Sequence, residues 1–306
     1  MRKLLLAVAF LVTLVSSANA AGEMKPIGWA EEYFPGATSG ATAAAPVEKK
    51  AVNPYAGKDV NTYLVGSYVS VADAKAKLES AGYTVVATYA PVKKGTTIVF
   101  TDAALQAEAA HTGRAHAAVL RMFVDDKEQT ISITNPIYFG KAFMQDDFKL
   151  SVFQNQLKTL NATFPGLKPS VDTLNFDKLA GFHFMIGMPY YEDADKLGEG
   201  TNEALLAKAK KYKKGKLFLY ELKLSNGTTL VGYDLSKRTK KFVKKIGRAN
   251  AAILPWSVVI EDGKATALNA KYYIAISYPL FTMTQFMGIA TVPGAIEKEL
   301  TKPFKK

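Results

Sequence analysis

An internal repeat constrains the fold of this 306-residue chain more than any other feature of its sequence. The segment Gly113–Leu120 reads Gly-Arg-Ala-His-Ala-Ala-Val-Leu, and Gly247–Leu254 repeats it at six of eight positions. Upstream, Thr-Thr-Ile-Val at 96–99 returns as Thr-Thr-Leu-Val at 228–231. Self-similarity of this kind is typical of a chain that builds the same supersecondary unit twice. The repeat therefore predicts a duplicated fold.

Downstream of these matches, Pro136 is paired with Pro279, and Phe143-Met144 with Phe286-Met287. The separation of the paired residues grows from 132 to 134 to 143 along the chain, which places insertions in the loops. We therefore expect two tandem related domains, over residues 59–165 and 178–303. Each is expected to be α+β, because alternating segments and short amphipathic segments recur in both halves.

Hydrophobic periodicity and turn residues predict the individual elements. The expected strands are 61–70, 83–89, 96–100, 115–124 and 130–134 in the first half, and 182–188, 216–224, 228–233, 249–260 and 264–276 in the second. The expected helices are 70–80, 103–110 and 148–160, then 203–212 and 236–246.

The repeated segment also resembles a known family. The motif Gly-Arg-Ala-x-Ala-Ala-[Val/Ile]-Leu, followed by Pro255, a hairpin at Asp262-Gly263 and the dipeptide Tyr278-Pro279, is similar to the domain of unknown function 302 family. The first half departs from the pattern, because Arg121 stands where the second half has proline. The resemblance implies that each half is an antiparallel sheet backed by helices, similar to the TATA-binding-protein-like architecture, with the two halves packed as a pseudo-dimer. It implies no reaction and no catalytic residues.

The first twenty residues are typical of a secretory signal peptide. Arg2 and Lys3 precede an uncharged, mostly apolar run at 4–15, and Ala18-Asn19-Ala20 supplies the small residues of a cleavage site. As a helix, the run would rise about 18 Å, short of the roughly 30 Å apolar thickness of a bilayer. We therefore expect a periplasmic protein, cleaved after Ala20, with no transmembrane span in the mature chain.

The segment that follows, 21–58, is rich in alanine, glycine and proline and predicts a flexible arm. Within it, Trp29, Tyr33 and Phe34 form an aromatic cluster that docks either on the body of the protein or on a partner. The chain has no cysteine, which excludes disulfides, thiolate nucleophiles and cysteine-built metal sites.

The formal charge of +12 predicts an anionic partner. For an exported protein, we expect anionic lipid, an acidic protein or a small anion rather than nucleic acid.

Arg114 and Arg248 are candidates for binding an anion, because they hold equivalent positions in the two repeats. If each begins a strand, alternation places Arg114 with His116, and Arg248 with Asn250, on one face. Two guanidinium groups related by pseudo-symmetry could clamp a carboxylate or a phosphate.

An alternative gives both arginines a structural role. Each guanidinium then pairs with a nearby acid such as Asp102 or Asp234 and fixes its strand. The change from His116 to Asn250 between the repeats counts against a symmetric catalytic pair.

A second candidate site is a metal site in the segment 181–188. On a strand, His183 and Met185 would share a face, and a histidine–methionine pair can ligate copper or haem iron. Against this, Phe182 and Phe184 are typical of an ordinary core strand, where methionine fills gaps.

The predicted helix at 236–246 carries a dense set of basic residues. This expected basic docking face consists of Lys237, Arg238, Lys240, Lys241, Lys244 and Lys245. It is either a solvated face or a surface for an acidic protein or an anionic membrane. The uncharged stretch 272–296, interrupted by Pro279, favours an apolar groove for a hydrophobic ligand over a membrane span.

No serine–histidine–acid spacing, phosphate-binding glycine loop, HExxH motif or EF-hand loop occurs in the sequence, so nothing in it argues for an enzyme. We expect a non-enzymatic protein that binds a small apolar or amphiphilic anionic ligand, or an acidic partner, between the two repeats. The alternative is a redox-associated protein that handles copper or haem. Whether two chains form a homodimer stays open.

Overall fold

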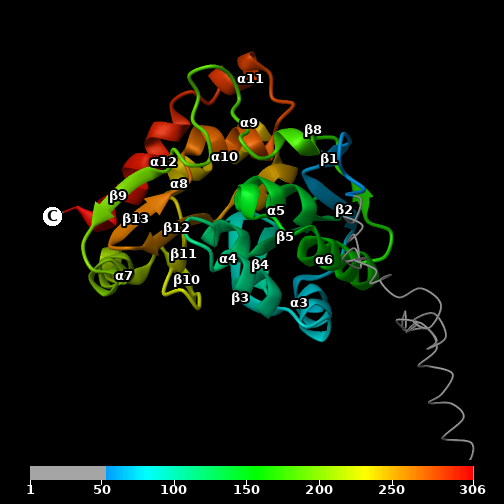
Figure 1. Cartoon of the computed structure of the whole chain (residues 1–306), viewed down its shortest axis with the longest axis horizontal. Coiled ribbons are helices and arrows are strands. Elements are labelled where there is room, and N and C mark those ends of the chain that lie inside the picture. The colour runs from blue at the N-terminus through cyan, green and yellow to red at the C-terminus, as the bar shows by residue number, and fades with distance from the viewer. Residues whose placement is uncertain (1–52, 306) are drawn as a thin grey trace, which may run out of the picture. The chain divides into compact units, whose positions relative to one another are not determined.

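Two antiparallel sheets with the same strand order organise the chain. The computed structural model describes residues 53–305, and Asn53–Lys306 form one compact unit (Figure 1). The fold is α+β, as predicted. The expected signal peptide at 1–20 and residues 21–52 of the expected arm, with Trp29, Tyr33 and Phe34, lie outside the described residues.

The first sheet has the order β3-β4-β5-β6-β2-β7. Its strands are β2 (Tyr63–Ser67), β3 (Thr84–Val92), β4 (Gly95–Thr101), β5 (Leu120–Asp125), β6 (Thr130–Thr134) and β7 (Lys168–Pro169). The second sheet has the order β10-β11-β12-β13-β9. Its strands are β9 (Asp195–Glu199), β10 (Phe218–Lys223), β11 (Thr229–Tyr233), β12 (Trp256–Glu261) and β13 (Lys264–Ala267). Apart from the edge strand β7, the two orders are equivalent, which is what a duplicated unit predicts.

The helices follow the same plan in both halves. The first half contains α3 (Val71–Ser80), α4 (Ala103–Ala109), the 3-10 helix η1 (Ala115–Ala118), α5 (Pro136–Met144), η2 (Gln145–Asp147) and α6 (Leu150–Thr163). The second half contains α7 (Asn202–Lys211), η4 (Tyr212–Gly215), α8 (Lys237–Lys240), α9 (Val243–Ile246), η5 (Arg248–Ile253), α10 (Ala270–Ser277), α11 (Met283–Met287), α12 (Val292–Thr301) and η6 (Lys302–Phe304). A two-stranded ladder of β1 (Asp59–Asn61) and β8 (Thr173–Asn175), followed by η3 (Phe176–Lys178), lies between the halves in sequence.

The repeated Gly-Arg-Ala segments cross between the two halves. The first segment continues into η1, which contacts β11 and β12 of the second sheet. The second segment forms η5, which contacts β3, β5 and β6 of the first sheet. In each half, the repeated Gly-Arg-Ala segment therefore packs against the sheet of the other half.

Three of the predicted strands are shorter than expected, and a fourth does not form. The strand expected at 115–124 begins as the 3-10 helix η1, whose three alanines are buried, and the one at 249–260 begins as η5. The strand expected at 264–276 ends after Ala267 and is followed by α10, in which every residue except Lys271 is buried. A helix buried on all sides shows no amphipathic period, so its apolar run cannot be distinguished from a strand by periodicity.

The segment 182–188 forms bends and turns instead of the expected strand. Gly181, directly before this segment, and Gly187 within it both have positive φ. A residue with positive φ lies in the left-handed backbone region, which favours glycine and is incompatible with a regular strand.

The downstream pairing of the repeats is also wrong. Asn135 caps the N-terminus of α5 by accepting from the backbone N–H of Ile137, and Asn269 caps α10 in the same way through Lys271. The equivalent helices are therefore α5 and α10, whereas Pro279 lies beyond α10. Asn135 and Asn269 are 134 residues apart, the same separation as Gly113 and Gly247. The insertion in the second half therefore follows α10.

The expected arm ends earlier than residue 58. The backbone N–H of Gly57 donates to Asp177 at 2.8 Å, and the carbonyl of Lys58 accepts from Phe176 at 2.9 Å. The ring of Tyr55 stacks on Phe176 with centroids 6.0 Å apart. Residues 53–58 are thus fixed against η3.

Within residues 53–305, no helix has both the length and the apolar character needed to cross a membrane. The uncharged stretch 272–296 is divided among α10, α11 and the start of α12.

Candidate functional site

A pocket of about 620 Å³ lies where the two halves meet and is lined by seven cationic side chains. We call it the lysine pocket. The hairpin turns after β3 and β5 contribute from the first half, and α8, α9 and η5 contribute from the second. Its lining residues are Ala90, Pro91, Val92, Lys93, Lys127, Lys237, Lys240, Lys241, Val243, Lys244 and Arg248. None of these residues is acidic.

The short helix α8 is fixed at its N-terminus by Ser236 and by Glu299 of α12. The hydroxyl of Ser236 accepts from the backbone N–H of Thr239, and Glu299 accepts from the backbone and hydroxyl of Ser236 at 2.7 and 2.6 Å. Burial alone would raise the pKa of Glu299, but the hydrogen bonds from Ser236 and Thr239 bring it below the usual range. Glu299 therefore stays ionised while it anchors the helix that carries the lysines.

Two of the pocket's lysines already have acidic partners. The Nζ of Lys240 lies 3.0 Å from the carboxylate of Asp234 and 5.1 Å from the ring centroid of Tyr89. Lys127 forms an exposed ion pair with Glu128 at 2.5 Å, and such a pair contributes little to stability.

The other four lysines of the pocket are exposed. Lys93, Lys237, Lys241 and Lys244 make no ion pair with any residue between 53 and 305. Pro91 and Val243 are buried beneath them, and Val92 is half-buried. The pocket thus combines unpaired positive charge with an apolar floor.

Arg248 is held within the protein. Its Nε donates to both carboxylate oxygens of Asp125 at 2.8 Å, and its Nη1 donates to the carbonyl of Lys93 at 2.7 Å. Its Nη2 donates to the carbonyl of Lys94. The guanidinium group therefore fixes the β3–β4 turn at the wall of the lysine pocket.

Arg114 is fixed in a similar way at a different place. Its Nε donates to Asp147 at 2.8 Å, its Nη1 lies 3.7 Å from Glu192, and its guanidinium carbon lies 5.5 Å from the ring centroid of Tyr191. It lines a separate pocket of about 200 Å³.

The structure therefore corrects the expected clamp. Neither arginine lies on a strand, and the two guanidinium groups do not share a pocket. The alternative of a structural role describes both, but with acids other than Asp102 and Asp234. Asp102 caps the N-terminus of α4, and Asp234 binds Lys240.

His116 and Asn250 also lie apart. His116 lies in η1 between the rings of Phe143 and Tyr191, where burial and the charge of Arg121 lower its pKa to about 3. Its imidazole is therefore neutral near pH 7.

Asn250 lines a third pocket, of about 690 Å³, on the first sheet. Its amide donates to the carbonyl of Ile246, and its own carbonyl accepts from the hydroxyl of Tyr278 at 2.6 Å. These hydrogen bonds give Asn250 a role in holding η5.

His183 and Met185 do not share a strand face, which removes the geometric basis of the expected metal pair. The ring of His183 packs on Tyr190 with centroids 4.5 Å apart, and Met185 is exposed. In the part of the chain that is described, no three His, Asp or Glu side chains come together as a group that could hold a metal.

Met185 is exposed and lies in the loop 181–190, close to which other large apolar side chains are exposed. This loop runs beside α11 (Figure 1). Phe184 stacks on Phe286 with centroids 5.3 Å apart, which holds the loop 181–190 against α11. The Nζ of Lys245 donates to the carbonyl of Gly288 at 2.8 Å, so α9 lies next to the end of α11. We call these exposed side chains the apolar tip, which consists of Met185, Ile186, Leu280, Met283 and Met287.

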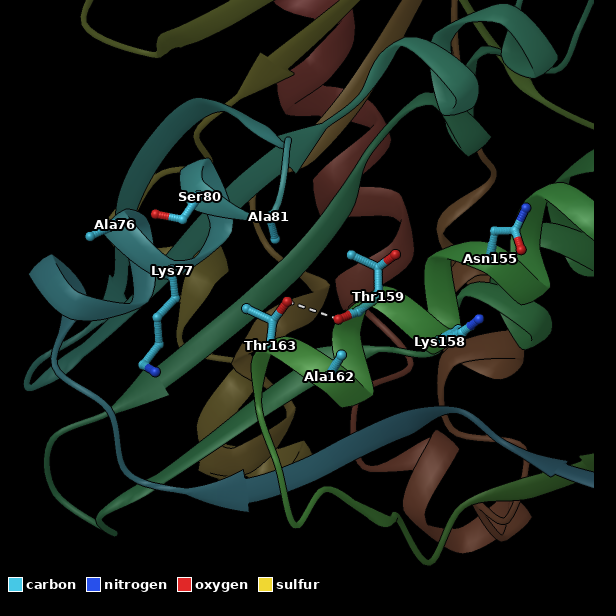
Figure 2. A pocket seen from close by; sticks show the side chains of 9 residues that line it. All are labelled: Ala76, Lys77, Ser80, Ala81, Asn155, Lys158, Thr159, Ala162 and Thr163. Atoms are coloured by element: carbon cyan, nitrogen blue, oxygen red, sulfur yellow. Dashed lines mark hydrogen bonds between the residues drawn. The ribbon is translucent and has the colours of Figure 1, made fainter. Parts of the chain in front are cut away.

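Another pocket, of about 780 Å³, lies between α3 and α6 (Figure 2). Small side chains line it, together with Lys77 and Lys158, and Figure 2 shows the Thr163 hydroxyl turned back to the carbonyl of Thr159 at 2.8 Å. It has neither an apolar floor of large side chains nor a convergent set of charges. We therefore take the lysine pocket as the candidate functional site.

The lysine-rich sequence at 236–246 predicts the basic residues of α8 and α9, but it does not predict that Lys93 and Lys127 line the same pocket. Each stands in a tight β-hairpin turn of the first half, more than 100 residues before α8. The turns Lys93-Lys94-Gly95 and Asp125-Asp-Lys-Glu128 are visible in the sequence, but only the crossing of the two halves brings them to the same pocket.

The chain matches no family model, no curated protein and no solved structure. The function is therefore argued from the geometry of the site.

Proposed function

We propose that this chain is an exported, non-enzymatic protein that binds an amphiphilic anion in the lysine pocket. The observation that carries the proposal is the set of four unpaired lysines above Pro91, Val92 and Val243. Lysine ammonium groups are mobile point charges suited to carboxylate or phosphate headgroups. An apolar chain attached to the headgroup would cover the floor.

The size and charge of the pocket support this ligand class. Its volume of about 620 Å³ lies in the range of roughly 300–1,000 Å³ that is typical of small-molecule sites. Lys127, Lys240 and Arg248 have carboxylate partners, whereas the other four cations have none among residues 53–305. A bound anion would relieve their mutual repulsion.

The lining residues do not favour an enzyme. Lysine, arginine, alanine, proline and valine supply charge and apolar contact, but no histidine, serine, threonine, tyrosine or carboxylate lines the pocket. General acid–base or nucleophilic catalysis usually relies on those side chains.

The proposal includes a pseudo-dimeric arrangement of two related domains, similar to the TATA-binding-protein-like architecture. It is supported by the equivalent strand orders and by the reciprocal contacts of η1 and η5. In such an arrangement the lysine pocket is a site that one domain alone could not form, and its pseudo-symmetric counterpart has diverged around Arg114.

We further propose that the protein meets its ligand at an anionic membrane surface in the periplasm. The apolar tip exposes large side chains next to Lys245, and Ile186 is 95% exposed. Apolar side chains flanked by lysines are typical of segments that enter the interface of an anionic bilayer. The basic docking face would supply the electrostatic part of this contact.

The first experiment is a calorimetric titration of the mature chain, purified from the periplasm, with dodecyl phosphate below its micelle concentration. We expect saturable binding, and affinity about tenfold weaker, or roughly 1.4 kcal/mol, in the triple variant Lys93→Gln/Lys241→Gln/Lys244→Gln. The control is Lys77→Gln/Lys158→Gln/Lys211→Gln, which changes the net charge equally away from the pocket and should bind as the wild type does. An equal loss of affinity in both variants would show that the ligand is attracted by net charge and not bound specifically in the lysine pocket.

Two further titrations test the ligand class and its source. Inorganic phosphate is expected to bind much more weakly than dodecyl phosphate, and similar affinities would rule out the apolar part of the proposal. Sedimentation with phosphatidylglycerol vesicles should exceed that with phosphatidylcholine vesicles and should fall in Ile186→Ser/Met287→Ser. If the wild type binds an acidic protein but not anionic vesicles, the partner of the basic docking face is a protein and not a membrane.

The metal-handling alternative has less support, because His183 and Met185 do not converge. Copper and haem titrations followed by absorbance are expected to produce no new bands. A band that disappears in His183→Ala would restore that alternative.

A further inference from the structure

Arg121 is a buried cation at the junction of the two halves, and it takes no part in the lysine pocket. It lies on β5 and is 6% exposed. Its Nη1 donates to the hydroxyl of Tyr273 on α10, and its Nη2 donates to the Oγ of Ser257 on β12 at 2.9 Å. Both of these partners are neutral and belong to the second half of the chain.

The charge of Arg121 has no carboxylate partner. Within the described range, no Asp or Glu oxygen lies within 4 Å of its guanidinium group. The ring of Tyr273, with its centroid 5.7 Å from the guanidinium carbon, provides a cation–π contact. A buried charge without an ionic partner costs several kcal/mol, so a counter-charge at this place would be strongly stabilising.

A small cavity lies beside the guanidinium group. Its lining includes Arg121, Ser257, Tyr273 and His116, and its volume is about 10 Å³, close to that of a single water-sized sphere. The remaining lining residues are apolar or aromatic: Phe143, Trp256 and Leu268.

Hydrogen-bond donors without acceptors surround this cavity. The Nε of Arg121 is buried and has no partner. The hydroxyls of Tyr273 and Ser257 accept from Arg121, and neither hydroxyl donates to any residue between 53 and 305. Arg121 has five N–H hydrogens and donates two of them, so with the two hydroxyl hydrogens five donor hydrogens have no acceptor among residues 53–305.

The donor pattern favours an anion over a water molecule. Water can accept two of these hydrogens, but it is neutral and leaves the charge of Arg121 uncompensated. A monatomic anion accepts from all donors and compensates the charge of Arg121 as well.

We propose that this cavity binds one chloride ion, which is the counter-ion of Arg121 and links the two halves of the chain. The ion is held by Arg121 of the first half and by Ser257 and Tyr273 of the second. Chloride is somewhat larger than water, so Phe143 and Leu268 shift slightly to admit it. The chain is consequently more stable in chloride than in a large polyatomic anion such as gluconate.

The test is thermal unfolding of the mature chain in sodium chloride and in sodium gluconate at equal ionic strength. A ligand that binds only the folded state raises stability with the logarithm of its concentration above Kd. We expect the midpoint to rise with chloride beyond its value in gluconate, and bromide to act as chloride does. Equal midpoints in chloride and gluconate would overturn the proposal.

Conservative variants locate the ion. Ser257→Ala and Tyr273→Phe each remove one donor without adding bulk, and each should weaken chloride binding roughly tenfold. The triple lysine-pocket variant should retain the full chloride effect, which separates this site from the proposed function. An unchanged chloride effect in both donor variants, or its loss in the lysine-pocket variant, would place the ion elsewhere.

A crystal grown in bromide gives a direct readout. An anomalous peak beside the Nε of Arg121 is expected in the wild type and should be absent in Arg121→Met. A wild-type crystal without the peak would overturn the site even if chloride stabilises the chain.

Discussion

The Nε of Arg248 lies 2.8 Å from both carboxylate oxygens of Asp125, and this contact joins the second half of the chain to the first. The side chain of Asp125 is 2% exposed and that of Arg248 is 22% exposed. The same guanidinium group holds the carbonyls of Lys93 and Lys94. One side chain of the repeated segment thus fixes both the junction of the halves and one wall of the lysine pocket.

Replacing this arginine should destabilise the chain strongly. Arg248→Ala leaves the buried carboxylate of Asp125 with only the backbone N–H groups of Lys127 and Glu128. We expect a loss of about 3 kcal/mol in the free energy of unfolding, measured by urea denaturation. Arg238→Ala, at an exposed position of α8, is the control and should stay within about 0.5 kcal/mol of the wild type. Similar losses in the two variants would contradict a specific role for the Arg248–Asp125 pair.

His116 should make the protein sensitive to acid. Burial and Arg121 lower its folded pKa to about 3, whereas an unfolded histidine has a pKa near 6.5, so the unfolded chain takes up the proton first. Stability is therefore lost as the pH falls below about 6.5, by about 2 kcal/mol between pH 7 and pH 5. The groups that face this imidazole are Arg121, Phe143 and Tyr191, with Arg114 and Glu261 in the adjoining pocket.

The variant His116→Asn, which carries the residue of the second repeat, tests this prediction. Urea denaturation at pH 7 and pH 5 in chloride-free buffer should show most of the pH-dependent loss removed. His111→Asn, at an exposed histidine, should keep the wild-type slope. If both variants keep the wild-type slope, another group titrates in this range.

Much of the architecture could be predicted from the sequence, because the repeat and the turn residues carry local information. The hairpin at Asn226-Gly227 forms as predicted, with Gly227 at a φ of 86°. The helices expected at 70–80 and 103–110 are α3 and α4. The equivalent order of the two sheets agrees with what the sequence repeat predicts.

The role of the repeated segment could not be predicted in the same way. Ala-rich segments such as Ala115–Ala118 alternate like strands on paper, but here they form 3-10 turns buried against the opposite sheet. The partners of Arg114 and Arg248 depend on that crossing. Asp125 lies 123 residues from Arg248, at a distance in sequence that local patterns do not reach.

A carboxylate in the second half should respond to pH in the opposite direction from His116. Burial and then the charge of Glu297 raise the pKa of Asp195 to about 6, above the value near 3.9 of an unfolded aspartate. The folded state holds this proton more tightly, so the contribution to stability is present at low pH and is lost as the pH rises through 6. At neutral pH the ionised side chain therefore destabilises the fold.

Asp195→Asn should relieve this cost and can keep the side-chain contact with Asn269, which now donates to Asp195 at 2.7 Å. We expect a gain of about 1 kcal/mol at pH 7.5, allowing for solvent screening, and little gain at pH 4.5. Thermal unfolding at the two pH values measures it, with Asp59→Asn at an exposed position as the control. A gain of the same size at both pH values would show that ionisation is not its cause.

Two glycines should respond to alanine with opposite signs. Gly232 lies on β11 directly opposite Tyr220 of β10, and a Cβ on Gly232 would lie 2.0 Å from that ring. Because the ring of Tyr220 is buried and would have to shift, Gly232→Ala should cost about 2–3 kcal/mol. Gly294 lies in α12, where no atom would come within 4 Å of an added Cβ. Gly294→Ala should therefore gain about 0.5–1 kcal/mol through its higher helix propensity. Urea denaturation of the two variants side by side decides the matter, because the substitution adds the same methyl group to both. No loss at Gly232 would contradict the close packing of Tyr220 over β11, and a loss at Gly294 would contradict the open space around that position in α12.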